Sequence, residues 1–120
     1  MAEHNKTGRK GELLALEFLR TKGYEILDTN WQDKKVEIDI IARFKGQLVI
    51  VEVKTRSSTV FEVPKEAVTI SKQRNIIKAT NAYIEMNSID LECRFDIVAI
   101  VISNNNSTIE HIEEAFYPLL

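Results

Sequence analysis

Residues 36–54 read VEIDIIARFKGQLVIVEVK, and this stretch decides how the chain folds. Two runs rich in β-branched residues, 36–43 and 48–54, lie on either side of Phe44-Lys45-Gly46-Gln47. β-Branched residues favour strands, and a short Gly-containing connection between two such runs is typical of a β-hairpin. The stretch therefore predicts two antiparallel strands joined by a tight turn at Lys45-Gly46.

The hairpin register predicts a cluster of charged side chains on one face. A two-residue turn sets Asp39 directly opposite Glu52 and Glu37 opposite Lys54, and opposed Cβ atoms lie about 4.5–5.5 Å apart. Side chains alternate along a strand, so the other face is expected to be entirely apolar. That apolar face comprises Ile38, Ile40, Ala42, Val49, Val51 and Val53.

Two opposed carboxylates, Asp39 and Glu52, repel each other and need a cation between them. A divalent metal ion meets this need, because carboxylate oxygens, a backbone carbonyl and waters suit octahedral Mg²⁺. Such an ion polarises a phosphoryl oxygen and activates a bound water, and the Lys54 ammonium would stabilise developing negative charge. The alternative is a solvated, salt-bridged sheet face, against which Ile41 and Ile50 on the same face argue.

The rest of the chain predicts two helices and three more strands. Apolar residues recur at three- and four-residue spacing before and after the hairpin, as in amphipathic helices. Thr7 is expected to cap the start of the first helix, and Gly23 stands where a C-terminal glycine cap belongs. The expected elements are a helix over 7–22, a strand over 24–30, the two hairpin strands, a mobile loop over 56–63, a helix over 66–86, and strands over 93–102 and 108–116.

The order αβββαββ predicts a mixed α/β (α+β) fold, with one mixed central sheet and a helix on each face. The 120 residues are expected to form a single domain, and 44% apolar with 28% charged residues is an ordinary globular composition. Cys93 is the only cysteine, so no internal disulfide can form. No stretch reaches the roughly 20 apolar residues that cross a bilayer, and the first residues lack an apolar signal core. We expect no membrane association and a cytoplasmic location.

Charge gives a mixed indication about nucleic acid. The formal net charge is −2, whereas nucleic-acid-binding domains usually carry a basic excess. A small enzyme can nevertheless concentrate its basic residues around one cleft. Basic residues here bunch at Lys6-Arg9-Lys10, Lys34-Lys35, Lys54-Arg56 and Lys72-Arg74-Lys78.

The motif Glu37-Ile38-Asp39, followed by Val51-Glu52-Val53-Lys54, resembles the PD-(D/E)XK nuclease signature in the form used by the YraN family. That family is bacterial, largely uncharacterised and similar to archaeal Holliday-junction resolvases. The resemblance implies a restriction-endonuclease-like domain. It extends along nearly the whole chain, through Gly11-Glu12, Gly23-Tyr24, Asn30-Trp31, Lys72-Gln73-Arg74 and Arg94-Phe95-Asp96.

The resemblance also implies roles for individual residues. Asp39 and Glu52 would ligate Mg²⁺ or Mn²⁺ together with the Val53 backbone carbonyl, and Lys54 would be the catalytic lysine. Glu12 matches the helix-borne glutamate of resolvase-like nucleases, and is a further candidate catalytic residue and metal ligand. A contact of Glu12 with Arg9 or with the backbone at the helix start is the alternative.

Two positions depart from the patterns. Ile38 stands where the nuclease signature has proline, as is usual for this family, and Val36 stands where the family typically has glycine. The larger Val36 side chain is expected to change how closely a phosphate backbone approaches this strand.

Four residues outside the carboxylate cluster are candidate contacts to DNA phosphates: Lys72, Gln73, Arg56 and Arg9. For Lys72 the alternative is simple snorkelling from the helix edge. Arg94 and Asp96 alternate onto one strand face, where they are expected to pair with each other. Trp31 is expected in the core or at a dimer surface, with base stacking as the alternative.

Three functions are consistent with these patterns. The first is a Mg²⁺-dependent endonuclease that hydrolyses DNA phosphodiester bonds, in branched or structured DNA during repair or recombination; the resolvase resemblance implies a homodimer. The second is a catalytically weak or inactive nucleic-acid-binding accessory module of the same fold. The third is a protein-interaction domain that uses the sheet face.

Overall fold

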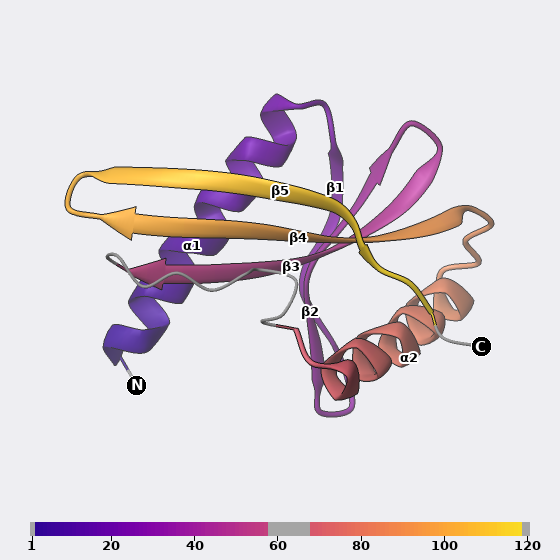
Figure 1. Ribbon diagram of the computed structural model, residues 1–120. Helices are drawn as coiled ribbons and strands as arrows, with labels where there is room; N and C mark the ends of the chain where they lie inside the picture. Colours follow the sequence, from indigo (N-terminus) through magenta and orange to yellow (C-terminus); the bar gives the residue numbers. More distant parts are fainter. Residues whose placement is uncertain (1, 58–67, 119–120) are drawn as a thin grey trace.

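The sheet and helices follow the expected order along the chain. The computed structural model describes residues 2–57 and 68–118, with side chains from residue 8 onward. Five strands form one sheet in the order β1-β2-β3-β4-β5, with β3 and β4 parallel and the other neighbours antiparallel. The elements are α1 (Ala2–Thr21), β1 (Glu25–Asp33), β2 (Val36–Phe44), β3 (Gln47–Ser57), α2 (Ile70–Met86), β4 (Glu92–Ser103) and β5 (Asn106–Phe116) (Figure 1).

The β2–β3 hairpin has the predicted register. Its ladder runs from Phe44↔Gln47 to Ile40↔Val51. The turn residues Lys45 and Gly46 both have positive φ, 48° and 80°. Two consecutive positive φ values are the signature of a type I′ turn, whose twist matches that of the strands it joins. The prediction of a tight hairpin at this position is therefore confirmed.

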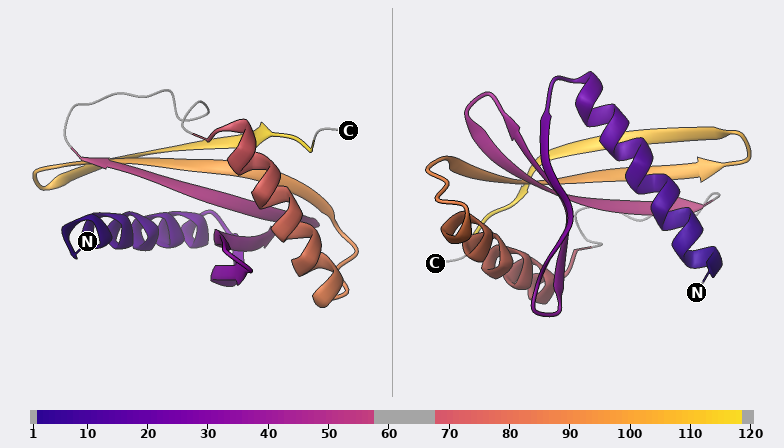
Figure 2. Two further views of the ribbon diagram at one scale, coloured as in Figure 1. Left: turned by 90° about the horizontal axis from the view of Figure 1, so that it is seen from below. Right: turned by 180° about the vertical axis from the view of Figure 1, so that it is seen from behind.

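The β1–β2 arm bends away from β3 beyond Ile40, and this corrects the predicted apolar face. β2 continues to pair with β1 as far as Val36, and the tip of this arm lies beside the first turns of α2 (Figures 1 and 2). Ile38 packs with Ile41 and Ile50, not with Ile40 as strict alternation predicted. A two-stranded ribbon twists more strongly than a wide sheet, so the free arm turns Ile38 toward α2.

Each helix covers one face of the sheet, as expected. Ala15 and Leu19 of α1 are fully buried in one cluster with Val49, Val51 and strand residues around them. Figure 1 shows α1 passing behind β3, β4 and β5, and the view from behind in Figure 2 shows it in front of them. The other cluster lies under α2, where Ile76, Ala79 and Tyr83 pack against Ile38, Ile41, Ile50, Phe95 and Ile97.

The sequence predicted the end of α1 correctly but not its start. α1 begins at Ala2, so the prediction of Thr7 as its N-cap is wrong. Gly23, at φ 95°, ends the helix as expected: its N–H donates to the Arg20 carbonyl, and the Tyr24 N–H donates to the Leu19 carbonyl. This is the Schellman arrangement, which requires the left-handed backbone that glycine adopts easily. 

The expected mobile loop and the second helix also need correction. Arg56 and Ser57 belong to β3, because the parallel ladder with β4 continues to Ser57↔Ile102. The rest of that expected loop, residues 58–63, lies outside the described residues, as do residues 66–67 of the expected helix. α2 itself begins after Thr69, whose hydroxyl accepts the Lys72 N–H at 3.1 Å. Neither described helix is long and apolar enough to span a membrane.

Candidate active site

Asp39 lies just beyond the point where β2 stops pairing with β3. Its side chain makes a hydrogen bond to β3 in place of the backbone of a paired strand. The last ladder pair is Ile40↔Val51, so Asp39 and Glu52 follow the ladder and do not form a pair in it. Asp39 Oδ2 accepts the backbone N–H of Val53 at 2.8 Å. In an extended strand the N–H and C=O of one residue face the same neighbour, so the Val53 carbonyl faces the same gap.

Glu52 is the most deeply buried carboxylate of this cluster. Its exposed fraction is 2%, and Oε1 lies 3.5 Å from the Lys72 ammonium. Oε2 is buried and has no hydrogen-bond partner among the residues that the structure describes. An unpartnered carboxylate oxygen in the interior is costly, so this atom marks a place where a cation or a donor would be bound.

The two carboxyl groups bind protons more tightly than usual. Burial, and then the charge of Glu52, raises the pKa of Asp39 to about 8. Burial also raises the pKa of Glu52, although the neighbouring Lys72 acts in the opposite direction. Desolvation and a like charge both disfavour the ionised form. A bound cation would reverse both effects, because it compensates the charge of each carboxylate.

Two lysines complete the cluster. Burial, and then the charge of Lys72, lowers the pKa of Lys54. Burial alone would lower the pKa of Lys72 too, but the charge of Glu52, the contact with Lys54 and the charge of Asp39 together outweigh burial, and the pKa is raised. The structure therefore brings together Asp39, Glu52, Lys54 and Lys72, the last from α2. The predicted pairing of Glu37 with Lys54 is not part of the ladder; Glu37 is exposed and lies opposite Gln32 of β1.

Glu12 reaches this region from α1, with a partner that the sequence did not indicate. Its Oε1 accepts the side-chain N–H of Asn30 at 3.0 Å, a partner different from Arg9 or the helix-start backbone, which were the alternative. Its charge contributes to the raised pKa of Asp39. Asn30 has φ 50°, a conformation that asparagine adopts more readily than most residues. The sequence feature that could have indicated this contact is an asparagine, Asn30, within a run otherwise typical of a strand.

The other candidate DNA contacts are Gln73, Arg56 and Arg9, which lie on α2, β3 and α1. Gln73 donates its side-chain N–H to the Val68 carbonyl at 2.9 Å, which helps to fix the start of α2. Arg56 donates to the Thr55 carbonyl at 3.2 Å. Arg9 is exposed on α1. Contact of these residues with DNA stays a prediction.

The donors at this site fit a small divalent cation. Among the described residues, no group of three or more His, Cys, Asp and Glu side chains is arranged to hold a metal ion. Mg²⁺ does not need such a group, because it usually keeps several waters and takes one or two carboxylates. Asp39, the unpartnered Oε2 of Glu52 and the Val53 carbonyl supply that smaller donor set.

A second polar cluster lies in the interior around Asp96, away from these carboxylates. Asp96 accepts two hydrogen bonds from Arg94, at 3.0 and 2.9 Å, which confirms their predicted pairing. It also accepts the Glu114 N–H and lies 2.7 Å from His111 Nε2. Tyr24 accepts a hydrogen bond from Arg94 at 2.6 Å. No local pattern indicates a role for His111, because its partners Asp96 and Lys22 are distant along the chain.

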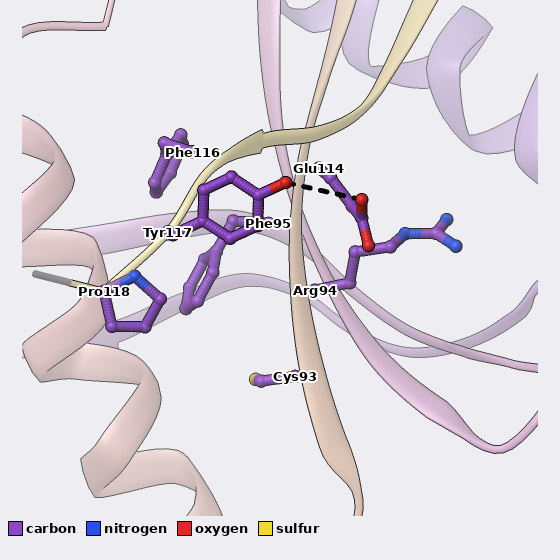
Figure 3. Close-up of a pocket in the computed structure, with 7 residues that line it drawn as sticks. All are labelled: Cys93, Arg94, Phe95, Glu114, Phe116, Tyr117 and Pro118. Atoms are coloured by element: carbon purple, nitrogen blue, oxygen red, sulfur yellow. Dashed lines mark hydrogen bonds between the residues drawn. The ribbon is translucent and has the colours of Figure 1, made fainter.

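A small pocket beside this cluster contains none of the predicted site residues. It is lined by Cys93, Arg94, Phe95, Glu114, Phe116, Tyr117 and Pro118 (Figure 3). The Arg94 guanidinium points away from Tyr117 and Pro118. Burial raises the pKa of the Cys93 thiol to about 11, so it stays protonated and is a poor nucleophile. The pocket is therefore not the candidate active site.

Trp31 is half-buried and packs against the core cluster under α2, close to the first of its two predicted positions. Its ring contacts Tyr83 edge to face, with 5.1 Å between ring centroids. The Tyr83 hydroxyl donates to Asp28 at 2.8 Å. These contacts hold α2, and with it Lys72, against the β1–β2 arm.

The fold and this site define a class of protein: a small α/β domain in which a half-buried and a buried acidic residue and two lysines gather where β2 stops pairing with β3. The model of the family described as "Uncharacterised protein family UPF0102" matches residues 11–100. A UPF0102 protein of Flavobacterium psychrophilum is 53% identical over 117 residues, and one of Phocaeicola vulgatus is 50% identical over 118; 98% of each chain is covered in both comparisons. A Bacteroides thetaiotaomicron relative is 47% identical over 120 residues, which cover 100% of this chain and 99% of the relative. The chain belongs to the UPF0102 family, which is also called YraN.

Proposed function

We propose that this protein is a metal-dependent endonuclease that hydrolyses phosphodiester bonds in DNA. The observation that carries the proposal is the closeness of Asp39 to the buried Glu52, whose charge acts on Asp39 and whose Oε2 lacks a partner among the described residues. The fold holds the half-buried Asp39 beside the buried Glu52, and two carboxylates that repel each other in this way are suited to holding a cation. Lys54 beside them supplies the third functional group of a nuclease centre.

Each residue has a distinct task in this proposal. Asp39, Glu52 and the Val53 carbonyl would hold Mg²⁺ or Mn²⁺. When bound, such an ion polarises a phosphoryl oxygen and lowers the pKa of a coordinated water. Lys54 orients the attacking water or stabilises the negative charge that develops on phosphorus-bound oxygens. Its lowered pKa suits it to exchange a proton, since burial weakens its hold on the third ammonium hydrogen.

The substrate class comes from the family resemblance and from the placement of basic residues. Lys72, Gln73, Arg56 and Arg9 are proposed to contact the phosphate backbone, while Glu12 supports the carboxylate pair from α1. Branched or structured DNA is the proposed substrate, in repair or recombination in the cytoplasm. A homodimer would present two such sites to two symmetric strands.

The experiment is a cleavage assay on four-way-junction, duplex and single-stranded DNA, with Mg²⁺ or Mn²⁺ and with a chelator. We expect metal-dependent cleavage by the wild type and only background cleavage by Asp39→Asn and Glu52→Gln. Asp90→Asn is the matched control, because Asp90 is an exposed aspartate beyond α2. The proposal fails if the wild type cleaves none of these substrates faster than Asp39→Asn does.

A nucleic-acid-binding accessory module is the second candidate function. The observation that favours it is the contact of Lys72 with Glu52, because this ammonium already neutralises one of the two metal ligands. The net charge of −2 is neutral between the two candidates, since both bind nucleic acid. For the accessory module, DNA binding would be the same with Mg²⁺ and with chelator, and would survive Asp39→Asn.

A further inference from the structure

Lys72 reaches the carboxylate pair from the solvent side. Its backbone lies in the first turn of α2, fixed by the hydrogen bond of its N–H to Thr69, while its side chain is 46% exposed. The Glu52 carboxylate that it contacts is 2% exposed. The helix start is held, but the four-carbon side chain is flexible and partly exposed, so the ammonium can leave without moving the backbone.

The cluster carries no net negative charge even without a bound ion. With all four groups ionised, the two carboxylates of Asp39 and Glu52 match the two ammonium groups of Lys54 and Lys72; below its pKa of about 8, Asp39 holds a proton and the balance is positive. A divalent cation that binds the ionised carboxylates adds two positive charges. Both ammonium groups would then lie beside a cation of higher charge, in a partly desolvated place where such repulsion is strong.

Lys72 is the ammonium that can relieve this repulsion. Lys54 extends from a strand inside the sheet and is half-buried, whereas Lys72 comes from a helix edge. Among the residues that the structure describes, Lys72 is the one lysine in an ion pair with a proposed metal ligand, and the partner oxygen is Oε1 of Glu52. A cation that binds Glu52 competes directly for that carboxylate. Displacement of Lys72 also removes a positive charge from beside Lys54.

We propose that Lys72 is an exchangeable counter-ion: it neutralises Glu52 in the metal-free protein, leaves when a divalent cation binds, and is then free to bind a substrate phosphate. This inference rests on the proposed function, because it uses the same metal ligands. It makes metal and nucleic-acid binding mutually supportive, since each favours the state in which Lys72 has left Glu52.

The first test is Mn²⁺ binding measured by calorimetry. Lys72→Met keeps the length of the side chain and removes the charge, and Lys78→Met is the matched control because Lys78 is an exposed lysine on the same helix. We expect Lys72→Met to bind Mn²⁺ at least about tenfold more tightly than the wild type, because a competing charge is gone. Lys78→Met should stay within about twofold. Equal or weaker binding by Lys72→Met would overturn the inference.

The second test uses the wild-type protein and does not depend on the stability of a variant. Amine-reactive labelling followed by mass spectrometry measures the reactivity of each lysine with and without Mg²⁺. Release from Glu52 should increase the labelling of Lys72 several-fold and leave Lys78 unchanged. If Mg²⁺ saturates a site that depends on Asp39 and Lys72 labelling does not change, the inference about Lys72 is overturned while the proposed function stands. If Asp39→Asn binds metal as well as the wild type does, the proposed function fails and this inference fails with it.

The third test measures the coupling to nucleic acid. Ca²⁺ serves as a divalent cation that binds oxygen ligands, and a DNA duplex is the probe. With chelator, Lys72→Met and wild type should bind DNA equally, because Lys72 is held by Glu52. With Ca²⁺, the wild type should bind at least about threefold more tightly than Lys72→Met, as expected for one added phosphate contact. The same ratio in both conditions would contradict the exchange.

Discussion

Gly11 of α1 lies against Thr55 of β3 so closely that no larger residue fits there. A Cβ atom added to Gly11 would lie 1.9 Å from Thr55 Oγ1 and 2.8 Å from Thr55 Cβ. This contact sets the distance between helix and sheet one residue before Glu12. The glycine therefore brings the helix-borne glutamate within electrostatic reach of Asp39.

Substitution of Gly11 tests this close approach. Gly11→Ala should destabilise the protein by about 2 kcal/mol, because overpacking forces the helix or Thr55 to shift. Gly8→Ala is the matched control: a Cβ there meets nothing within 4 Å among the described residues, and alanine should stabilise the helix by about 0.5–1 kcal/mol. Urea denaturation followed by circular dichroism measures both. If Gly11→Ala is as stable as Gly8→Ala, the close contact between Gly11 and Thr55 is contradicted.

The hydrogen bond between Asn30 and Glu12 leads to a second prediction. Asn30→Gly removes the side chain but keeps a residue that tolerates φ 50°. We expect a roughly tenfold or greater loss of Mn²⁺ affinity and of cleavage, as is usual when a residue that orients a metal-site ligand is lost. Asn30→Asp should lose more, because it sets a carboxylate against Glu12. In the Glu12→Gln background, Asn30→Gly should have little further effect; an undiminished effect there would place the role of Asn30 elsewhere.

The raised pKa of Asp39 gives a pH-dependent prediction about stability. Between pH 4 and its pKa of about 8, the native protein holds a proton that the unfolded chain has released. The contribution of Asp39 to stability therefore decreases as pH rises through this range. Asp39→Asn removes the dependence, so at pH 8–9 without metal it should unfold at a temperature several degrees higher than the wild type.

The difference between Asp39→Asn and wild type should become small at pH 4–5. At that pH the carboxyl group is already protonated in the native state. Asp90→Asn is the control, because it changes an exposed aspartate with the same formal charge. Thermal denaturation across the pH series measures the effect. A difference that is constant from pH 5 to pH 9 would show that the ionisation of Asp39 is not its cause.

The buried pair of Arg94 and Asp96 predicts a large loss of stability on substitution. Burial alone would raise the pKa of Asp96, but hydrogen bonds from His111, Arg94 and the Glu114 N–H hold it below its usual range. Arg94→Met should cost about 3–5 kcal/mol, because it leaves the buried Asp96 charge without the partner that donates two of its hydrogen bonds. The stabilising contribution of Asp96 should be present above pH 4 and be lost as pH falls further.

Arg43→Met is the matched control for this pair. Arg43 pairs with Glu25 at 3.4 Å, but both side chains are more than half exposed. Exposed ion pairs contribute less than about 1 kcal/mol, because water and salt screen them. Denaturant titration should therefore separate the two arginines clearly. Similar losses for Arg94→Met and Arg43→Met would contradict the dominant role of burial.

Local patterns in the sequence were sufficient for most of the fold. The hairpin at Lys45-Gly46 and the glycine cap at Gly23 depend on the backbone preferences of a few adjacent residues, so they could be predicted. The expected start at Thr7 was wrong because helix boundaries are weakly encoded. Ile38 was assigned to the wrong face because the twist of the free β1–β2 arm depends on where β3 stops pairing, which no local pattern reveals.

The part of the candidate site that lies within the hairpin could also be predicted from local sequence. Asp39, Glu52 and Lys54 lie on adjacent strands of one hairpin, so a register argument could group them. Lys72 was a candidate contact to DNA phosphates, but its ion pair with Glu52 depends on the packing of α2. The side chain of Asn30 reaches Glu12 because α1 crosses the sheet at that point. Such long-range contacts depend on tertiary structure, and no periodic pattern in the sequence indicates them.

The cluster around Asp96 also has a consequence for the order of events during synthesis. Lys22 Nζ lies 2.8 Å from His111 Nδ1, a contact that joins residues 89 positions apart in the sequence. Before β5 has left the ribosome, a nascent chain already contains Asp96 but lacks His111 and the Glu114 N–H that share its charge. Contacts of such long range also slow folding. Ribosome-bound chains that end before residue 106 should therefore stay open to proteases and chaperones, and the domain should close only when its last strand emerges.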